Sequence, residues 1–233
     1  GDNIYLTSAI KIATLRQVIL KRVMDIVISI VGILLTILVG LIILPIVKMQ
    51  APGPLIFTQT RIGQNGKKFK IYKFRSMYID AEERKAKLLS QNELETTLMF
   101  KMDNDPRVFP FGQKLRDWSL DELPQFINVL KGDMSFVGPR PDVPGYADQL
   151  QGDERDILKL KPGITGPASL KYRNEEEILS SVSNPTKYND EVIFPDKVRL
   201  NLYYLHHYSF RKDIQMIVCT VFGKQMDYAG EQI

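Results

Sequence analysis

The sequence predicts an α+β fold that is mostly helical, with a re-entrant membrane helix, a short β-hairpin and amphipathic interfacial helices. Three observations predict it. Residues 26–47 form a run of 22 residues without a charged side chain. Residues 68–74 alternate basic and apolar side chains, which is the period of a half-exposed strand. Several later segments have the apolar spacing of surface helices.

The uncharged run is long enough to cross a membrane. As a helix it would rise about 33 Å, and the hydrocarbon core of a bilayer is roughly 30 Å thick. A soluble helix is seldom apolar on every face over this length, and the run begins too far into the chain for a signal peptide. We therefore expect residues 1–50 to be an N-terminal segment with a membrane helix, and residues 51–233 to form a cytoplasmic, membrane-associated domain.

Both flanks of the uncharged run are basic. The cytoplasmic flanks of membrane helices are enriched in Lys and Arg, so two basic flanks favour a helix that enters the membrane, breaks and returns to the cytoplasmic side. Gly40 and Pro45 are the predicted break, because proline removes a backbone donor and disturbs the preceding turn. The flanking basic residues are Lys11, Arg16, Lys21 and Arg22 before the run, and Lys48, Arg61, Lys67, Lys68, Lys70 and Lys73 after it.

A hairpin is predicted directly after the membrane segment. Turn-forming residues at 51–54 end that segment, and residues 55–59 have the composition of a short strand. A second turn at 63–66 leads into the alternating residues 68–74, so we expect the two strands to pair. Residues 79–99 and 123–130 then have helical patterns.

The second half of the chain mixes predicted loops and helices. Residues 132–141 and 161–167 are dense in Gly and Pro and are predicted to be loops, and residues 180–196 are predicted to be polar and irregular. Residues 198–222 predict one or two amphipathic helices whose aromatic side chains lie near lipid headgroups. These aromatic residues are Tyr203, Tyr204, Tyr208 and Phe210.

Charge and cysteine content exclude little. The formal charge of +4 suits an anionic membrane surface or a phosphate-rich ligand as well as nucleic acid. Cys219 is the only cysteine, so no internal disulfide forms, and a reducing, cytoplasmic setting fits. The chain begins with Gly1 instead of Met, so we expect that upstream residues are missing.

Residues 119–124 read Ser-Leu-Asp-Glu-Leu-Pro, which is the pattern of a helix start. On this pattern alone, helix capping is the favoured interpretation of Asp121 and Glu122. Two arginines favour another: Arg116 lies five residues before Asp121, and Arg140 lies in a proline-rich loop. Carboxylates beside arginines suit phosphate chemistry, because a carboxylate binds Mg²⁺ or attacks phosphorus while arginines neutralise phosphate oxygens.

Lys73 and Arg75 add two further cations close to the predicted hairpin. A solvated basic strand that touches lipid headgroups is an equally good interpretation of this pair from the residues alone. No zinc-site spacing and no phosphate-binding loop of the G-x-x-x-x-G-K-[ST] type occurs in the sequence.

Several ordered blocks of sequence resemble one family, the monotopic phosphoglycosyl transferases, also called the bacterial sugar transferase family. Together the blocks cover most of the chain, which makes the resemblance more specific than any single motif. The blocks are KRVMD (21–25), PGP (52–54), QTRIG (59–63), YKFRSM (72–77), DPR (105–107), SLDELPQ (119–125), NVLKGDMSFVGPRP (128–141) and KPGITG (161–166).

The resemblance implies an activity. Asp121 would be the nucleophile that attacks the sugar-linked phosphorus of a UDP-sugar, releases UMP and forms a covalent phospho-sugar enzyme, and Glu122 would be its partner carboxylate. Polyprenyl (undecaprenyl) phosphate would then attack the intermediate, which is the first membrane step of O-antigen, capsule or exopolysaccharide assembly. Asp121 would also contact Mg²⁺. The residues expected to bind substrate are Lys73, Arg75, Arg116 and Arg140.

The resemblance also implies a place in the cell. Residues 51–233 would be the catalytic domain at the cytoplasmic face of the bacterial inner membrane, with no nucleic-acid partner. Many family members have the helix-breaking proline about ten residues before the equivalent of Lys48, where this chain has Leu38, so Pro45 is close to the helix exit. Residues 180–196 resemble an insertion. Larger members carry further membrane helices upstream. The resemblance leaves two expectations for this chain: the catalytic part of such a larger member, or a complete small member.

Two other functions remain open from the sequence. The first is a non-enzymatic, membrane-anchored module that binds anionic lipids or glycans through its basic strand. The second is a phosphatase or nucleotide-sugar hydrolase with the same acid pair. The sequence names neither the sugar nor the oligomeric state, and a homo-oligomer is compatible with it.

Overall fold

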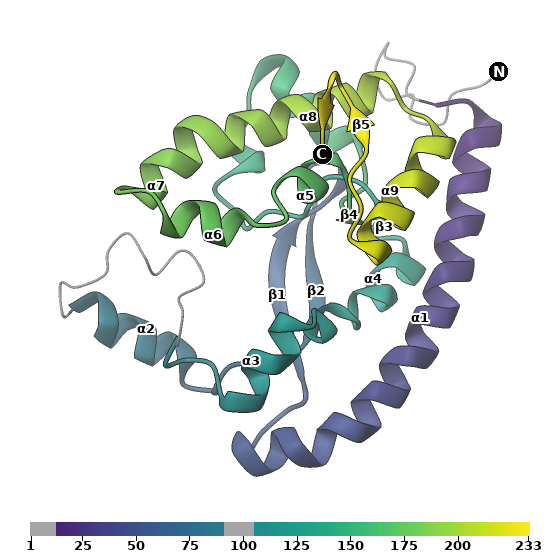
Figure 1. The fold of residues 1–233 in the computed structure, drawn as a ribbon. Coiled ribbons are helices and arrows are strands. Elements are labelled where there is room, and N and C mark those ends of the chain that lie inside the picture. Colours follow the sequence, from purple (N-terminus) through teal and green to yellow (C-terminus); the bar gives the residue numbers. More distant parts are fainter. Residues whose placement is uncertain (1–12, 91–104) are drawn as a thin grey trace.

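The computed structural model describes residues 13–90 and 105–233. One long helix runs along one side of the molecule, and the other elements pack on its inner side (Figure 1). As predicted, the described part is mostly helical with short sheets. Its α-helices are α1 (Leu15–Gln50), α2 (Ala81–Ser90), α3 (Pro110–Asp117), α4 (Gln125–Lys131), α5 (Pro167–Lys171), α6 (Glu175–Ser180), α7 (Pro185–Tyr188), α8 (Phe194–His206) and α9 (Phe210–Phe222). Its strands are β1 (Ile56–Ile62), β2 (Lys68–Phe74), β3 (Ser135–Val137), β4 (Gly163–Thr165), β5 (Asp227–Tyr228) and β6 (Glu231–Gln232).

Helix α1 is apolar on its outer face and carries its polar residues on the inner one. Large side chains point outward, with Val31, Leu34 and Leu41 each more than 60% exposed at 65%, 64% and 67%. This is the reverse of a water-soluble helix, whose apolar face is buried. The buried residues recur every three or four positions, as one helical stripe does. They are Lys21, Asp25, Ser29, Gly32, Thr36, Gly40, Ile43 and Val47.

The membrane helix predicted from the sequence corresponds to α1. Among the described residues, it is the one helix whose length and apolar composition would let it cross a membrane. The helix continues through Gly40 and Pro45 without interruption and curves inward at its lower end (Figure 1). Pro45 therefore sits inside a continuous helix, and re-entry into the membrane stays a prediction.

The upper half of α1 is tied to the rest of the chain by buried polar contacts. Lys21 Nζ donates to Asp213 Oδ2 of α9 at 2.7 Å and to the Val137 carbonyl of β3 at 2.9 Å. Asp25 Oδ1 accepts from the Phe136 backbone N–H at 2.9 Å. These contacts position β3, and with it the loop that follows.

The predicted hairpin is confirmed. Strands β1 and β2 are antiparallel and are joined by the turn η1 (Gln64–Gly66). A fully buried asparagine, Asn128 of α4, holds β2 by its free edge. Its side chain accepts from the Tyr72 N–H at 3.0 Å and donates to the Lys70 carbonyl at 2.8 Å. These two hydrogen bonds fix the position of β2, and therefore of Lys73, along α4.

The two Gly- and Pro-rich segments predicted to be loops contain short paired strands. β3 and β4 form a parallel pair in which Ser135 lies opposite Gly163 and Val137 opposite Thr165. The backbones are so close that a Cβ added to Gly163 would lie 2.1 Å from the Gly138 nitrogen. Only glycine allows the two backbones to come this close. The glycines that predicted a loop therefore allow β3 and β4, which are distant in the sequence, to pair.

Residues 180–196, predicted to be irregular, are largely helical. They include α7, the single π-helical turn η5 (Asn189–Ile193) and the start of α8. The predicted amphipathic helices after residue 198 are two, α8 and α9. Tyr204 does not lie near headgroups: it is 1% exposed and donates to Asp213 Oδ1 at 2.7 Å. Helix α2 confirms the start of the predicted helix 79–99, and residues 91–99 lie outside the described residues.

Candidate active site

The carboxylate pair lies on a short helical turn, η2 (Leu120–Glu122), between α3 and α4. Ser119 precedes it with a left-handed backbone (φ 54°), and its side chain makes no capping hydrogen bond. The prediction that Ser119 caps a helix and that Glu122 completes the capping box is therefore wrong. The reason is local: a left-handed residue turns its side chain away from the N–H groups that a cap satisfies. Both carboxylates are thus released from a capping role.

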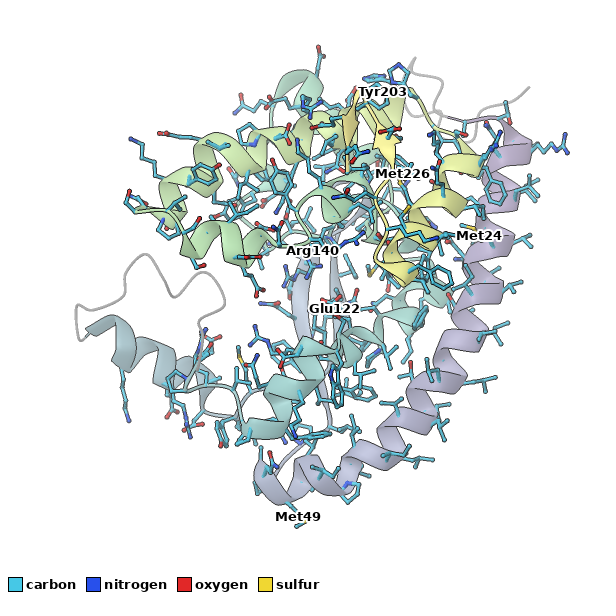
Figure 2. All side chains as sticks on the ribbon, in the orientation of Figure 1. Met24, Met49, Glu122, Arg140, Tyr203 and Met226 are labelled. Atoms are coloured by element: carbon cyan, nitrogen blue, oxygen red, sulfur yellow. The ribbon has the colours of Figure 1, made fainter. Side chains whose placement is uncertain are left out.

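Glu122 is held between two cations from different elements. Its Oε1 accepts from Lys73 Nζ of β2 at 2.9 Å and from Arg140 Nη2 at 3.1 Å. Burial alone would raise the pKa of Glu122, but the charges of Arg140 and Lys73 and their hydrogen bonds outweigh it and lower the pKa to about 2. Glu122 is therefore a permanent anion at neutral pH. Glu122 and Arg140 lie close together near the centre of the molecule (Figure 2).

Asp121 is the more buried member of the pair, with 9% of its surface exposed. Its charge, together with that of Glu122, helps to raise the pKa of Arg140, where Glu122 has the largest effect and burial opposes it. Arg140 extends from the loop after β3, which the β3 and β4 backbones hold in place. The structure therefore brings together Asp121, Glu122, Lys73 and Arg140 as the sequence predicted.

A cavity of about 680 Å³ opens beside this cluster, a size typical of small-molecule sites. Its lining includes Arg116 of α3 and Arg140, two of the predicted substrate-binding residues. It also includes Arg61 of β1, which the sequence analysis treated only as a flanking charge. Arg173 is the fourth arginine in the lining, and it donates to the Cys219 and Lys224 carbonyls. Arginine guanidinium groups bind phosphate with paired hydrogen bonds, so the other three in this cavity suit a diphosphate.

Arg75 is not part of this cluster. Its guanidinium donates to three backbone carbonyls, those of Ala51, Pro54 and Met77. Ala51 and Pro54 directly follow α1, and Met77 follows β2. The contacts give Arg75 a structural role in holding the hairpin against the end of the membrane helix.

Most cavity residues have no predicted role from the sequence, and Arg61, Asp142 and Asn201 are among them. Arg61 donates to the Pro141 carbonyl at 3.1 Å and to Gln59 Oε1 at 2.6 Å, which places it beside the Arg140 loop. Burial raises the pKa of Asp142 to about 6, against the nearby charges of Lys197, Arg61 and Arg140. The proline-rich block ending at Pro141 was the one available signal for Asp142, and Asn201 had none.

The residues present fit Mg²⁺ only in company with a phosphate ligand. Among the described residues there is no group of three or more His, Cys, Asp or Glu side chains that could hold a metal ion. Mg²⁺ is commonly held by one or two carboxylates together with substrate phosphates and waters. Asp121, next to an arginine-lined cavity, provides that donor set, whereas Glu122 is already engaged by two cations.

Comparison with known proteins gives one family for nearly the whole chain. The model of the family described as "Bacterial sugar transferase" matches residues 16–225. The chain is 39% identical to a galactosyl transferase CpsE of Streptococcus agalactiae over 93% of its own length and 44% of the relative's. It is 40% identical to a UDP-glucose:undecaprenyl-phosphate glucose-1-phosphate transferase of Escherichia coli over 88% of its length and 40% of the relative's.

A third, shorter relative is covered more completely. The chain is 40% identical to a putative undecaprenyl-phosphate N-acetylgalactosaminyl 1-phosphate transferase of Bacillus subtilis, over 60% of its own length and 72% of the relative's. The chain thus spans about two fifths of the length of the first two relatives and corresponds to only part of them.

Proposed function

We propose, because this chain belongs to the bacterial sugar transferase family, that it transfers a sugar 1-phosphate from a UDP-sugar to polyprenyl phosphate and releases UMP. The observation that carries the proposal is the ion-paired Glu122 next to Asp121, with its partner Arg140 in the wall of an arginine-lined cavity. The names of relatives agree, since they include a UDP-glucose:undecaprenyl-phosphate glucose-1-phosphate transferase and an undecaprenyl-phosphate galactose phosphotransferase.

The proposed reaction has two displacements at one phosphorus. An Asp121 carboxylate oxygen attacks the phosphorus that carries the sugar, and the bond from that phosphorus to the bridging oxygen breaks. UMP leaves with both electrons of that bond. A phosphate oxygen of polyprenyl phosphate then attacks the phosphorus of the aspartyl intermediate, and Asp121 leaves as a carboxylate. The products are UMP and polyprenyl-diphospho-sugar, and no net proton is required.

Glu122 contributes by ordering the cations. Lys73 and Arg140 both donate to it, so each is fixed in place before a substrate binds. Preorganised cations stabilise charge that builds up on a transferring phosphoryl group better than mobile ones do. Arg116 and Arg61 would bind the remaining phosphate oxygens. Asp121 would hold Mg²⁺ jointly with those oxygens, and the ion would neutralise phosphate charge when bound.

The proposal places the chain at the cytoplasmic face of the bacterial inner membrane. The exposed apolar face of α1 supports contact with lipid, and a polyprenyl acceptor requires it. In this setting the reaction would be the first membrane step of O-antigen, capsule or exopolysaccharide assembly. The names of the relatives include different sugars, so an assay is needed to identify the sugar that this chain transfers.

The test is UMP release by protein held in detergent or nanodiscs with Mg²⁺, undecaprenyl phosphate and a panel of UDP-sugars. We expect UMP and polyprenyl-diphospho-sugar in equal amounts with one donor. The Asp121→Asn variant should lose both, by at least a thousandfold, and should form no covalent phospho-sugar adduct detectable by intact-protein mass spectrometry.

Two outcomes would contradict the proposal. Free sugar 1-phosphate without lipid product would identify a hydrolase, in which water replaces the acceptor. A lipid-binding module would be identified by folded protein that releases no UMP from any donor and binds anionic vesicles equally well with and without the Asp121→Asn change.

A further inference from the structure

Buried polar atoms without a partner gather in the wall of the cavity. Arg61 Nε, Ser169 Oγ and Asn201 Oδ1 are buried, make no hydrogen bond and belong to residues that line it. Over residues 13–90 and 105–233, the Tyr228 hydroxyl is the one other buried side-chain atom without a hydrogen-bond partner, and Tyr228 does not line the cavity. A buried polar group without a hydrogen-bond partner destabilises the folded protein. Three in one wall point to a ligand that supplies the missing partners.

Two of these atoms come from helices that pack together. Ser169 lies on α5 and Asn201 on α8, and the two helices are in contact. Asn201 is 6% exposed. Lys197 lies one helical turn before Asn201 and lines the same cavity, so both residues are on the cavity face of α8. The region between α5 and α8 is called the inner recess below.

Asp142 connects the inner recess to the arginines. Asp142 lines the same cavity as Lys197, Arg61 and Arg140, and the charges of these three residues act on its carboxylate. The carboxylate makes no hydrogen bond or ion pair with any residue that the structure describes. It therefore adds a second acceptor without a donor next to the amide oxygen of Asn201.

The chemistry of these groups selects one part of a nucleotide-sugar. A carboxylate and an amide oxygen accept hydrogen bonds, and a serine hydroxyl accepts or donates. A uracil ring offers a single N–H donor and two carbonyl acceptors, so it would leave such a site short of donors. A hexose offers several hydroxyl donors, and an acetamido sugar adds an N–H. Phosphate oxygens are themselves acceptors, so they would leave Asp142 and Asn201 without donors.

We infer that the inner recess between α5 and α8 binds the sugar ring of the donor, with Asn201 and Asp142 accepting hydrogen bonds from its hydroxyl groups and Ser169 as a further partner. The inference rests on the proposed function and deepens it. It makes Asn201 a residue that determines which sugar is transferred, because a site built to hydrogen-bond a hydroxyl rejects an analogue that lacks it or turns it away.

The test compares binding of UDP and of UDP-sugars by isothermal titration calorimetry. All proteins carry Asp121→Asn, so that no covalent step obscures the affinity. UDP-glucose, UDP-galactose and UDP-N-acetylgalactosamine are the probes, and the tightest is taken as the donor. We expect Asn201→Ala to weaken binding of that donor about tenfold, as the loss of one buried hydrogen bond would. Binding of UDP should change less than about twofold.

The control is Asn189→Ala. Asn189 is equally buried, at 7% exposure, but donates to Asp190 and does not line the cavity. It should leave both affinities unchanged. Ser169→Ala is a smaller change that replaces Asn201→Ala in the test if that variant unfolds. It should weaken binding of the donor about threefold and leave binding of UDP unchanged.

Three results would overturn the inference, and they differ from one another. Equal weakening of UDP and UDP-sugar by Asn201→Ala would assign the recess to the nucleotide. Unchanged affinities in both recess variants would remove it from the binding site while leaving the transferase proposal intact. Absence of binding for UDP and every UDP-sugar, both in the Asp121→Asn protein and in protein that keeps Asp121, would overturn the proposed function along with it.

Discussion

Two carboxylates near the same arginines respond to them in opposite ways. At Glu122 the charges and hydrogen bonds of Arg140 and Lys73 outweigh burial, and the pKa falls to about 2. At Asp142 burial outweighs Lys197, Arg61 and Arg140, and the pKa rises to about 6. The difference is contact: Glu122 accepts hydrogen bonds from its cations, whereas Asp142 is reached only by their field. The two residues therefore predict opposite pH dependences of stability.

Glu122 should stabilise the fold at neutral pH and lose this effect in acid. Its pKa is lower in the folded state than the ordinary value of 4.5, so the unfolded chain binds the proton first. The stabilisation is complete above about pH 4.5 and fades as the pH falls toward 2. We expect Glu122→Gln to lower the Tm at pH 7 and to have a shrinking effect below pH 4.5. A constant difference in Tm across this range would contradict the assignment.

Asp142 should do the reverse. Its pKa is higher in the folded state than the ordinary value of 3.8, so the ionised carboxylate destabilises the fold above about pH 6. We expect Asp142→Asn to raise the Tm at pH 8, with a gain that shrinks as the pH falls from 6 toward 4. Differential scanning fluorimetry in detergent measures it. A variant less stable than the parent at pH 8 would show that Asp142 has a partner that we have not identified.

At the scale of elements, α1 and α4 meet where a glycine makes room for an aromatic ring. A Cβ added to Gly32 would lie 2.4 Å from Cγ of Phe126. Gly32→Ala should therefore destabilise the protein by about 1–3 kcal/mol, because the ring base cannot move without shifting α4. Gly40→Ala is the matched control on the same helix, since its Cβ would lie 3.4 Å from Phe74, an ordinary contact. Equal unfolding midpoints for the two variants would refute this account.

Helices α1 and α9 are joined by the buried Lys21–Asp213 pair, whose side chains are 9% and 0% exposed. Removing one partner of a buried ion pair typically costs about 3–5 kcal/mol, because the other charge stays buried. We expect this loss for Lys21→Met, measured by chemical unfolding, and partial recovery when Asp213→Asn is added. Lys48→Met, at the exposed end of the same helix, should have little effect. Additive single and double changes would show that the pair is not coupled.

Elements with a pattern in their own local sequence were predicted, and elements that depend on contacts between distant segments were not. The hairpin and α1 have local patterns, an alternation and an apolar run. The hairpin was predicted close to its observed bounds, whereas α1 begins at Leu15, well before the uncharged run 26–47. Strands β3 and β4 pair across distant segments through glycines, which look like loop residues locally. The helical turns in residues 180–196 carry few apolar residues, so their periodicity was too weak to detect.

The candidate site also contains residues that sequence motifs identify and residues that they do not. Asp121, Glu122, Lys73, Arg116 and Arg140 lie in or beside motif blocks, and the structure gathers them. Arg75 shares its block with Lys73 but donates to the backbone at the end of α1 instead of joining the cluster. Asn201 has no motif, because its role depends on which face of α8 meets the cavity, and packing decides that.

At the scale of the whole molecule, the burial pattern of α1 bears on its topology. The buried stripe extends from Lys21 to Val47, so other elements cover one side of the helix over a rise of about 39 Å. If the helix crossed the bilayer at right angles, these elements would have to enter the hydrocarbon beside it. A helix that keeps both ends on one side of the membrane would avoid this, and whether α1 does so stays a prediction.

Cysteine labelling tests that topology. In a Cys219→Ser background, single changes Arg16→Cys and Met49→Cys place thiols at exposed positions near the two ends of α1. We expect a membrane-impermeant maleimide to label both in inverted inner-membrane vesicles and neither in spheroplasts. Labelling of the two positions from opposite sides would establish a helix that spans the membrane.

The polar stripe of α1 also sets an order of events during synthesis. Lys21 leaves the ribosome 192 residues before Asp213, its buried partner. At about 5–20 residues per second, the charged face of α1 waits roughly 10–40 s for α9. Until then α1 is an apolar helix whose Lys21 lacks its carboxylate partner, and an unpaired charge is costly to bury in lipid. Membrane insertion of α1 would therefore be completed only after α9 is made.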